Sequence, residues 1–157
     1  MMGDRPRLLL IAAILFASAL VLPRPAGAAL GGSADSVEAD RAALSAVRGA
    51  VTAGNGYSIH EINYGGTVVR EYVSSNGTVF AVAWNGARHP DLSVLLGAYA
   101  GSYEEALRGT THQPGARHLS LKADGVVVQK WGHVRNLQGR AYVPALMPAG
   151  VSTDEIR

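Results

Sequence analysis

The sequence contains no cysteine. This absence excludes disulfide bonds, thiol catalysis and thiolate metal sites, and it also excludes a lipid anchor on an N-terminal cysteine. Many small exported proteins depend on disulfides for stability. This chain must instead be stabilised by the burial of its own apolar side chains.

Motifs for nucleophilic catalysis are also missing, because neither GxSxG nor SxxK occurs. The histidines are few and scattered: His60, His89, His112, His118 and His133. No two of them have the i, i+2 or i, i+4 spacing that places two imidazoles on one face of a strand or helix. The sequence therefore predicts neither a metal site nor a cofactor.

The first 28 residues have the pattern of a secretory signal peptide. Arg5 and Arg7 precede an apolar run from Leu8 to Leu22, and the small residues Ala26–Ala28 follow. Fifteen apolar residues are fewer than the ~20 that a membrane-spanning helix needs. We therefore expect cleavage after Ala28, a periplasmic or secreted location and no membrane span afterwards, with an uncleaved anchor as the alternative.

Removing this leader changes the charge balance. The remaining part, residues 29–157, has 11 basic and 11 acidic residues, so the basic character of the whole chain comes largely from the leader. No basic patch for nucleic acid is predicted. A length of 129 residues suits one domain with its own apolar core.

A β-hairpin is the clearest structural signal. Thr67–Val73 and Thr78–Trp84 are rich in β-branched and aromatic residues, and Asn76-Gly77 between them suits a two-residue turn. That turn would pair Val73 with Phe80, Glu71 with Val82 and Val69 with Trp84 on one face. Tyr57–Tyr64 is predicted as a third strand of the same meander.

Two helices are predicted. Asp91 is a suitable N-cap for an amphipathic helix in which Leu92, Leu95, Leu96, Tyr99, Tyr103 and Leu107 follow the 3.6-residue period. Gly97 and Gly101 within it suggest close approach to another backbone, over Ala81 and Ala83. A short N-terminal helix is expected in the alanine-rich segment 33–48, followed by a flexible link at 53–56.

A second β-rich region extends from Arg117 to Val143. Its expected features are a turn at Asp124-Gly125, a strand over Val126–Trp131, a bend at Gly132, a strand over His133–Leu137 and a turn at Gln138-Gly139. Together the elements predict an α+β fold: an antiparallel β-meander sheet with one packed amphipathic helix and a short N-terminal helix.

Few residues carry recognisable chemistry. Glu61 and Glu71 form the only carboxylate pair on predicted neighbouring strands, and we expect Glu71 to form an ion pair with Arg70, Arg135 or Arg140. The candidate polar or binding cluster is Arg70, Glu71, Trp84, Trp131, His133 and Arg140. The tryptophans and tyrosines are expected chiefly in the core, with a ligand groove as the alternative.

The chain also resembles a family of exported bacterial proteins catalogued as domain of unknown function 2844. The resemblance rests on segments 29–32, 68–74, 76–84, 90–92, 95–97, 139–144 and 148–151. It implies an envelope or secreted bacterial protein. It implies no activity, cofactor or catalytic residue.

These observations favour a non-enzymatic binding or accessory module of the envelope, whose partner is an envelope protein or a small ligand. One alternative is a small hydrolase or lyase that uses Glu71, His133 and Arg140 in one cleft. Another is an apolar-ligand carrier, with an internal cavity of at least about 300 Å³ lined by the tryptophans and tyrosines.

Overall fold

The computed structural model describes residues 30–111, residue 115 and residues 117–157. The predicted signal peptide and His112 lie outside the described residues. Within them no helix combines the length and the apolar character that crossing a membrane requires.

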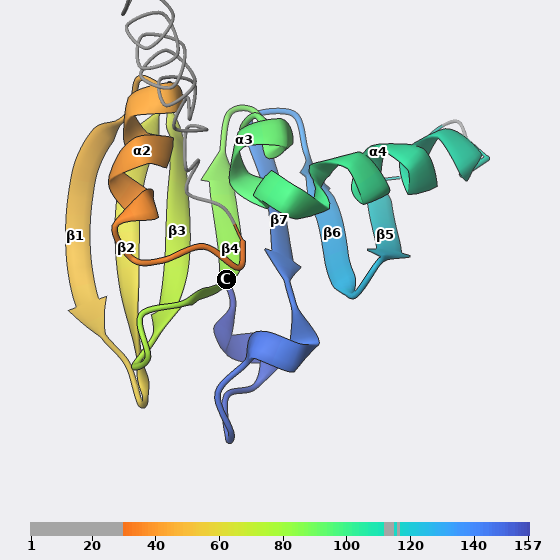
Figure 1. Cartoon of the computed structure of the whole chain (residues 1–157). Helices are drawn as coiled ribbons and strands as arrows, with labels where there is room; N and C mark the ends of the chain where they lie inside the picture. The colour runs from red at the N-terminus through yellow and green to blue at the C-terminus, as the bar shows by residue number, and fades with distance from the viewer. Residues whose placement is uncertain (1–29, 112–114, 116) are drawn as a thin grey trace, which may run out of the picture.

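A seven-stranded antiparallel sheet forms the centre of the molecule (Figure 1). Its strands are β1 (Val47–Ala53), β2 (Tyr57–Tyr64), β3 (Thr67–Ser74), β4 (Val79–Gly86), β5 (His118–Ala123), β6 (Val126–His133) and β7 (Asn136–Tyr142). The spatial order is β1-β2-β3-β4-β7-β6-β5. Two meanders, β1–β4 and β5–β7, are thus joined edge to edge by the pairing of β4 with β7.

Helices cover one face of this sheet. They are α2 (Ser36–Ala43), α3 (Leu92–Leu96), the 3₁₀ turn η1 (Gly97–Tyr99) and α4 (Ala100–Gly109). Figure 1 shows α2 over β1–β3, and α3 with α4 over the other half of the sheet. Two further 3₁₀ turns, η2 (Pro144–Leu146) and η3 (Thr153–Glu155), belong to the C-terminal segment. The predicted α+β fold, an antiparallel sheet with a packed helix, is confirmed.

Both faces of the sheet are buried at its centre, around β3 and β4. Val69, Val82 and Trp84 lie on the helix-covered face and pack with Leu95 and Leu96. The opposite face holds a smaller cluster of Tyr72, Phe80, Ala81, Ala83 and Ile156, the last from the C-terminal segment. Burial on both sides explains why β4 is apolar at every position from Val79 to Trp84.

The β3–β4 hairpin exists as predicted, but its loop is longer. Glu71 pairs with Val82 and Val69 with Trp84, whereas Val73 pairs with Val79 rather than Phe80. The loop takes four residues, Ser75–Thr78, with Gly77 at φ +82°. This loop introduces a bulge after Tyr72, which turns Phe80 to the face opposite the helices.

The predicted amphipathic helix is divided. Asp91 caps it as expected, because its carboxylate accepts a hydrogen bond from the backbone N–H of Ser93 at 2.9 Å. Gly97 then adopts φ +49°, which ends α3 before α4 begins. The predicted close approach is wrong: a Cβ added to Gly101 would have no neighbour within 4 Å, and Ala81 and Ala83 face away from the helices.

The N-terminal helix is shorter than the sequence predicts. Helix α2 ends at Ala43, and Val47 already begins β1, which the alanine-rich pattern concealed. The predicted flexible link at 53–56 is the tight turn between β1 and β2, in which the Gly54 N–H donates to the Tyr57 carbonyl at 2.8 Å. β1 is an exposed edge strand, so it lacks the apolar alternation that identifies half-buried strands.

The last hairpin also differs from the prediction. β6 and β7 turn at Val134 and Arg135, and the latter adopts φ +66° without being glycine. Gln138 and Gly139, predicted as a turn, lie inside β7. A Cβ on Gly139 would lie 2.2 Å from Cζ2 of Trp84, so glycine is needed there for packing rather than for turning.

Candidate functional site

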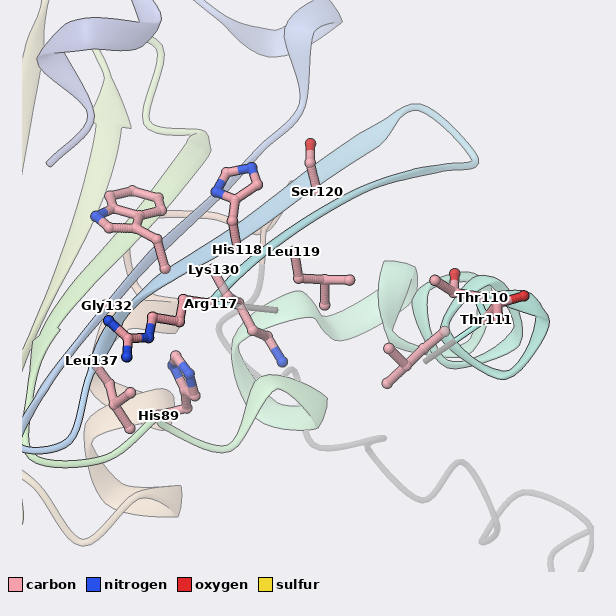
Figure 2. Close-up of a pocket in the computed structure, with 12 residues that line it drawn as sticks. His89, Thr110, Thr111, Arg117, His118, Leu119, Ser120, Lys130, Gly132 and Leu137 are labelled. Carbon is pink, nitrogen blue, oxygen red and sulfur yellow. The ribbon is translucent and has the colours of Figure 1, made fainter. Parts of the chain in front are cut away.

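A large cavity lies where the β5–β6 hairpin faces the end of α4 and the loop before α3 (Figure 2). Its volume is about 700 Å³. The lining residues are His89, Leu107, Thr110, Thr111, Arg117, His118, Leu119, Ser120, Lys130, Trp131, Gly132 and Leu137. In Figure 2, His89 and Lys130 lie below the hairpin, while His118 and Ser120 project from its other side.

The described lining carries four nitrogen-bearing side chains besides Trp131, and no carboxylate. His89, Arg117, His118 and Lys130 contribute hydrogen-bond donors, and the sequence from 109 to 117 contains no acidic residue either. The remaining lining includes Leu107, Leu119 and Leu137, and Trp131 contributes from the face opposite the helices, where Arg140 contacts its ring. A site of this composition suits a ligand with an apolar body and an anionic group.

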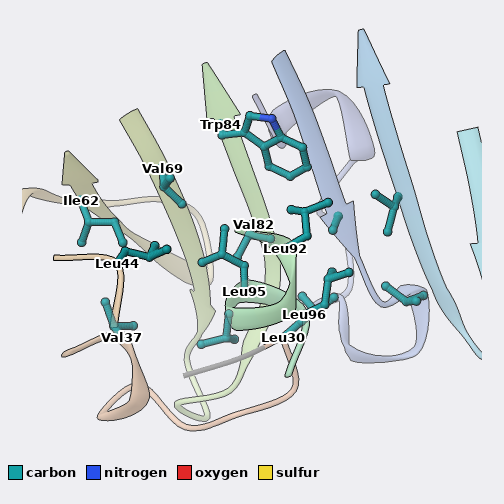
Figure 3. Packing of buried hydrophobic residues seen from close by; sticks show 14 of the residues in the cluster. Leu30, Val37, Leu44, Ile62, Val69, Val82, Trp84, Leu92, Leu95 and Leu96 are labelled. Carbon is teal, nitrogen blue, oxygen red and sulfur yellow. The ribbon is translucent and has the colours of Figure 1, made fainter. Parts of the chain in front are cut away.

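His89 is held in a defined orientation. The indole Nε1–H of Trp84 donates to His89 Nδ1 at 2.8 Å, and the two rings meet edge to face at 5.9 Å between centroids. Trp84 is itself buried in the core beside Leu92 (Figure 3). Because Nδ1 accepts this bond, the proton of a neutral His89 resides on Nε2.

The backbone next to His89 is fixed as well. The buried Thr67 hydroxyl donates to the Arg88 carbonyl at 2.8 Å and accepts from the Arg88 N–H at 3.3 Å. Burial and the nearby charge of Lys130 lower the pKa of His89 below its usual value. His89 is therefore a neutral hydrogen-bond donor at neutral pH.

Lys130 projects from β6 on the helix-covered face. Its ammonium group lies 5.2 Å from the ring centroid of Tyr103, a cation–π contact with α4. Lys130 and Leu107 also line a neighbouring cavity of about 400 Å³ that Tyr103 reaches. The Tyr103 hydroxyl is buried there without a hydrogen-bond partner among the described residues.

The predicted polar cluster does not assemble into one site. Trp131 lines the large cavity, and Trp84 contributes through His89. Arg70 forms an ion pair with Glu61 at 2.8 Å on the face opposite the helices. His133 is exposed at the β6–β7 turn, where its ring contacts the Val134 carbonyl at 3.3 Å.

Arg140 is also on the face opposite the helices. Its guanidinium donates to the Gln129 side chain at 2.7 Å and to the Thr153 carbonyl, and it lies 5.8 Å from the ring centroid of Trp131. Arg140 pairs with Ala83, and Glu71 pairs with Val82, so the two charged residues lie on opposite faces. Through its bond to Thr153, Arg140 holds the C-terminal segment against the sheet.

Glu71 forms no ion pair with any described residue, contrary to the prediction. It is fully buried beneath α2, and neither of its carboxylate oxygens has a hydrogen-bond partner among the described residues. Asp40 of α2 is buried and unpartnered in the same way. Burial raises the pKa of Glu71 to about 7, and burial together with Glu71 raises the pKa of Asp40 to about 9.

Sequence reasoning missed two of these arrangements. Asp40 lies between Val37 and Leu44 at helical spacing, so the helical period was a signal that it faces the core. No sequence pattern marks His89, because only the fold places it against Trp84. No group of three or more metal-ligating side chains is present in residues 30–111, 115 and 117–157.

The fold and the cavity define an α+β domain with a large basic cleft at the end of its sheet. The chain belongs to the family described as Protein of unknown function (DUF2844), whose model matches residues 26–156. The resemblance inferred from the sequence is therefore confirmed. No curated protein and no solved structure gives a significant match to the chain.

Proposed function

We propose that this is an exported bacterial protein, periplasmic or secreted, that works as a non-enzymatic binding or accessory module. Its ligand site is the cavity between α4 and the β5–β6 hairpin, and its ligand is a small organic anion. The signal-peptide pattern of residues 1–28 supports export. The observation that carries the ligand class is the cavity lining, which combines donors and cations with apolar side chains and no described carboxylate.

The geometry disfavours the two alternatives. A hydrolase or lyase with Glu71, His133 and Arg140 in one cleft is incompatible with Glu71 and Arg140 lying on opposite faces of the sheet. A carrier with an aromatic cavity would need the tryptophans and tyrosines around one space. Of these residues, only Trp131 is among the described residues that line the large cavity.

Three probes with the same alkyl chain test the proposal: octanoate, octanol and octylamine. Isothermal titration calorimetry of the purified protein should give the tightest binding for octanoate, because Lys130 and Arg117 attract the carboxylate. Octanoate binding should weaken as salt is added, since exposed charges are screened. Octylamine should bind more weakly than octanol.

A pair of substitutions tests whether octanoate binds in this cavity. The test variant is Lys130→Met and the control is Lys122→Met. Lys122 is exposed on β5 and does not line the cavity. Loss of the Lys130 charge should weaken octanoate binding about tenfold, whereas Lys122→Met should change it little. Equal effects of the two substitutions, or octylamine binding as tight as octanoate, would refute the proposed function.

A further inference from the structure

The arrangement of His89, Trp84 and Lys130 indicates a narrower ligand class. We propose that His89 is a specificity-determining residue: Trp84 fixes it as a neutral Nε2–H donor beside the Lys130 ammonium, and together they select a carboxylate. This inference rests on the proposed function, since it concerns the same cavity.

The donor pattern supports this choice. His89 Nδ1 is occupied by the Trp84 N–H at 2.8 Å, so Nε2–H is the polar group that His89 has available for a ligand. One N–H donor and one ammonium match the two oxygens and the single negative charge of a carboxylate. Because His89 is neutral, this pair of side chains carries a single positive charge, which balances a carboxylate but not the second negative charge of a phosphate.

Trp84 also keeps His89 neutral by geometry. Protonation of Nδ1 would set its N–H against the N–H of Trp84, so two donors would oppose each other at 2.8 Å. The charge of Lys130 adds to this effect, and the other basic residues among the described lining are Arg117 and His118. The charged neighbours of His89 in the chain point elsewhere, because Arg88 lies 5.8 Å from the Tyr64 ring centroid and Asp91 caps α3.

The first test compares two substitutions of His89. His89→Gln offers an amide oxygen for Trp84 and an N–H₂ donor for the ligand, whereas His89→Phe offers neither. We expect His89→Phe to weaken octanoate binding at least about tenfold, since hydrogen bonds to charged groups are strong, and His89→Gln to retain most of it. The exposed His133→Phe is the control and should leave octanoate binding unchanged.

The second test determines the tautomer of His89 and the effect of Trp84 on the pH dependence of octanoate binding. Nitrogen-15 NMR of the histidine rings should show the Nε2–H form of His89 at pH 7. In Trp84→Phe, Nδ1 is free to protonate, so octanoate affinity should rise as the pH falls below the ordinary histidine pKa of about 6.5, because burial and Lys130 still lower the pKa of His89. The unsubstituted protein should show a smaller rise over the same range.

The ligand class is tested with octyl phosphate beside octanoate, where octanoate should bind more tightly. Tight octanoate binding with equal affinities in His89→Phe and His89→Gln would overturn this inference and leave the proposed function standing. An Nδ1–H tautomer, or preference for octyl phosphate, would also overturn it. No octanoate binding would refute the proposed function itself, while the NMR result would still report on the Trp84–His89 arrangement.

Discussion

Asp40 and Glu71 are the residues whose chemistry departs most from what their sequence positions suggest. Both carboxyl groups, Asp40 of α2 and Glu71 of β3, are buried without hydrogen-bond partners among the described residues. An ionised carboxylate in such surroundings is costly, so protonation is the physically favoured state. His60 pairs with Glu71 across β2 and β3, but its ring bonds to the Ser58 hydroxyl at 3.1 Å and leaves Glu71 unpartnered among the described residues.

This buried pair makes the stability of the fold dependent on pH. The unfolded chain releases both protons near the ordinary pKa values of 3.8 and 4.5, whereas the folded chain keeps them until about 7 for Glu71 and about 9 for Asp40. Between these limits the folded state binds more protons, so the contribution to the free energy of unfolding decreases as the pH rises. Urea denaturation of the protein at pH 5 and pH 9 should show the decrease.

Asp40→Asn and Glu71→Gln should each reduce this loss, because neither amide can ionise. The matched control is Glu61→Gln, which removes a partly exposed carboxylate that is paired with Arg70. We expect the control to keep the pH dependence of the unsubstituted protein. If Asp40→Asn and Glu71→Gln lose as much stability between pH 5 and pH 9 as Glu61→Gln does, the buried pair is not the cause.

At the scale of elements, the sequence patterns predict helices, strands and turns correctly where the local residue pattern agrees with the burial of the side chains. The strands β2, β3 and β4, the Asp91 cap and the Asp124-Gly125 turn were all predicted. Errors arose where tertiary contacts decide the outcome. Gly139 resembles a turn residue but is required by the Trp84 ring, and the true turn at Arg135 has no glycine to mark it.

Gly139→Ala tests this explanation of the β7 error. The added methyl group would meet the Trp84 ring at 2.2 Å and the Gln129 carbonyl oxygen at 2.7 Å, so we expect a loss of about 1–3 kcal/mol in the free energy of unfolding. Gly101→Ala in α4 is the control, because its methyl group would meet nothing within 4 Å and alanine favours a helix. It should leave stability unchanged or raise it, and equal losses in the two variants would contradict the packing explanation.

At the scale of the whole molecule, the fold class was predictable but the site was not. An α+β fold follows from alternating strands, turn residues and one amphipathic helix, all of which are local patterns. The cavity instead combines residues from the loop before α3, the end of α4 and β5–β7. The charge of the cavity depends on which side chains the pairing of β4 with β7 brings together. No spacing of residues in the sequence predicts that pairing.

Export is the remaining prediction for the whole chain, and the leader allows a sharp test. Signal peptidases require small side chains immediately before the cut and two residues earlier, while the residue between them is less restricted. Mass spectrometry of the chain expressed in a bacterial host should therefore find a form beginning at Ala29. Ala28→Gln should block trimming, and Gly27→Gln, the neighbouring control, should allow it. An untrimmed chain confined to the cytoplasm, or equal trimming of both variants, would contradict export by this leader.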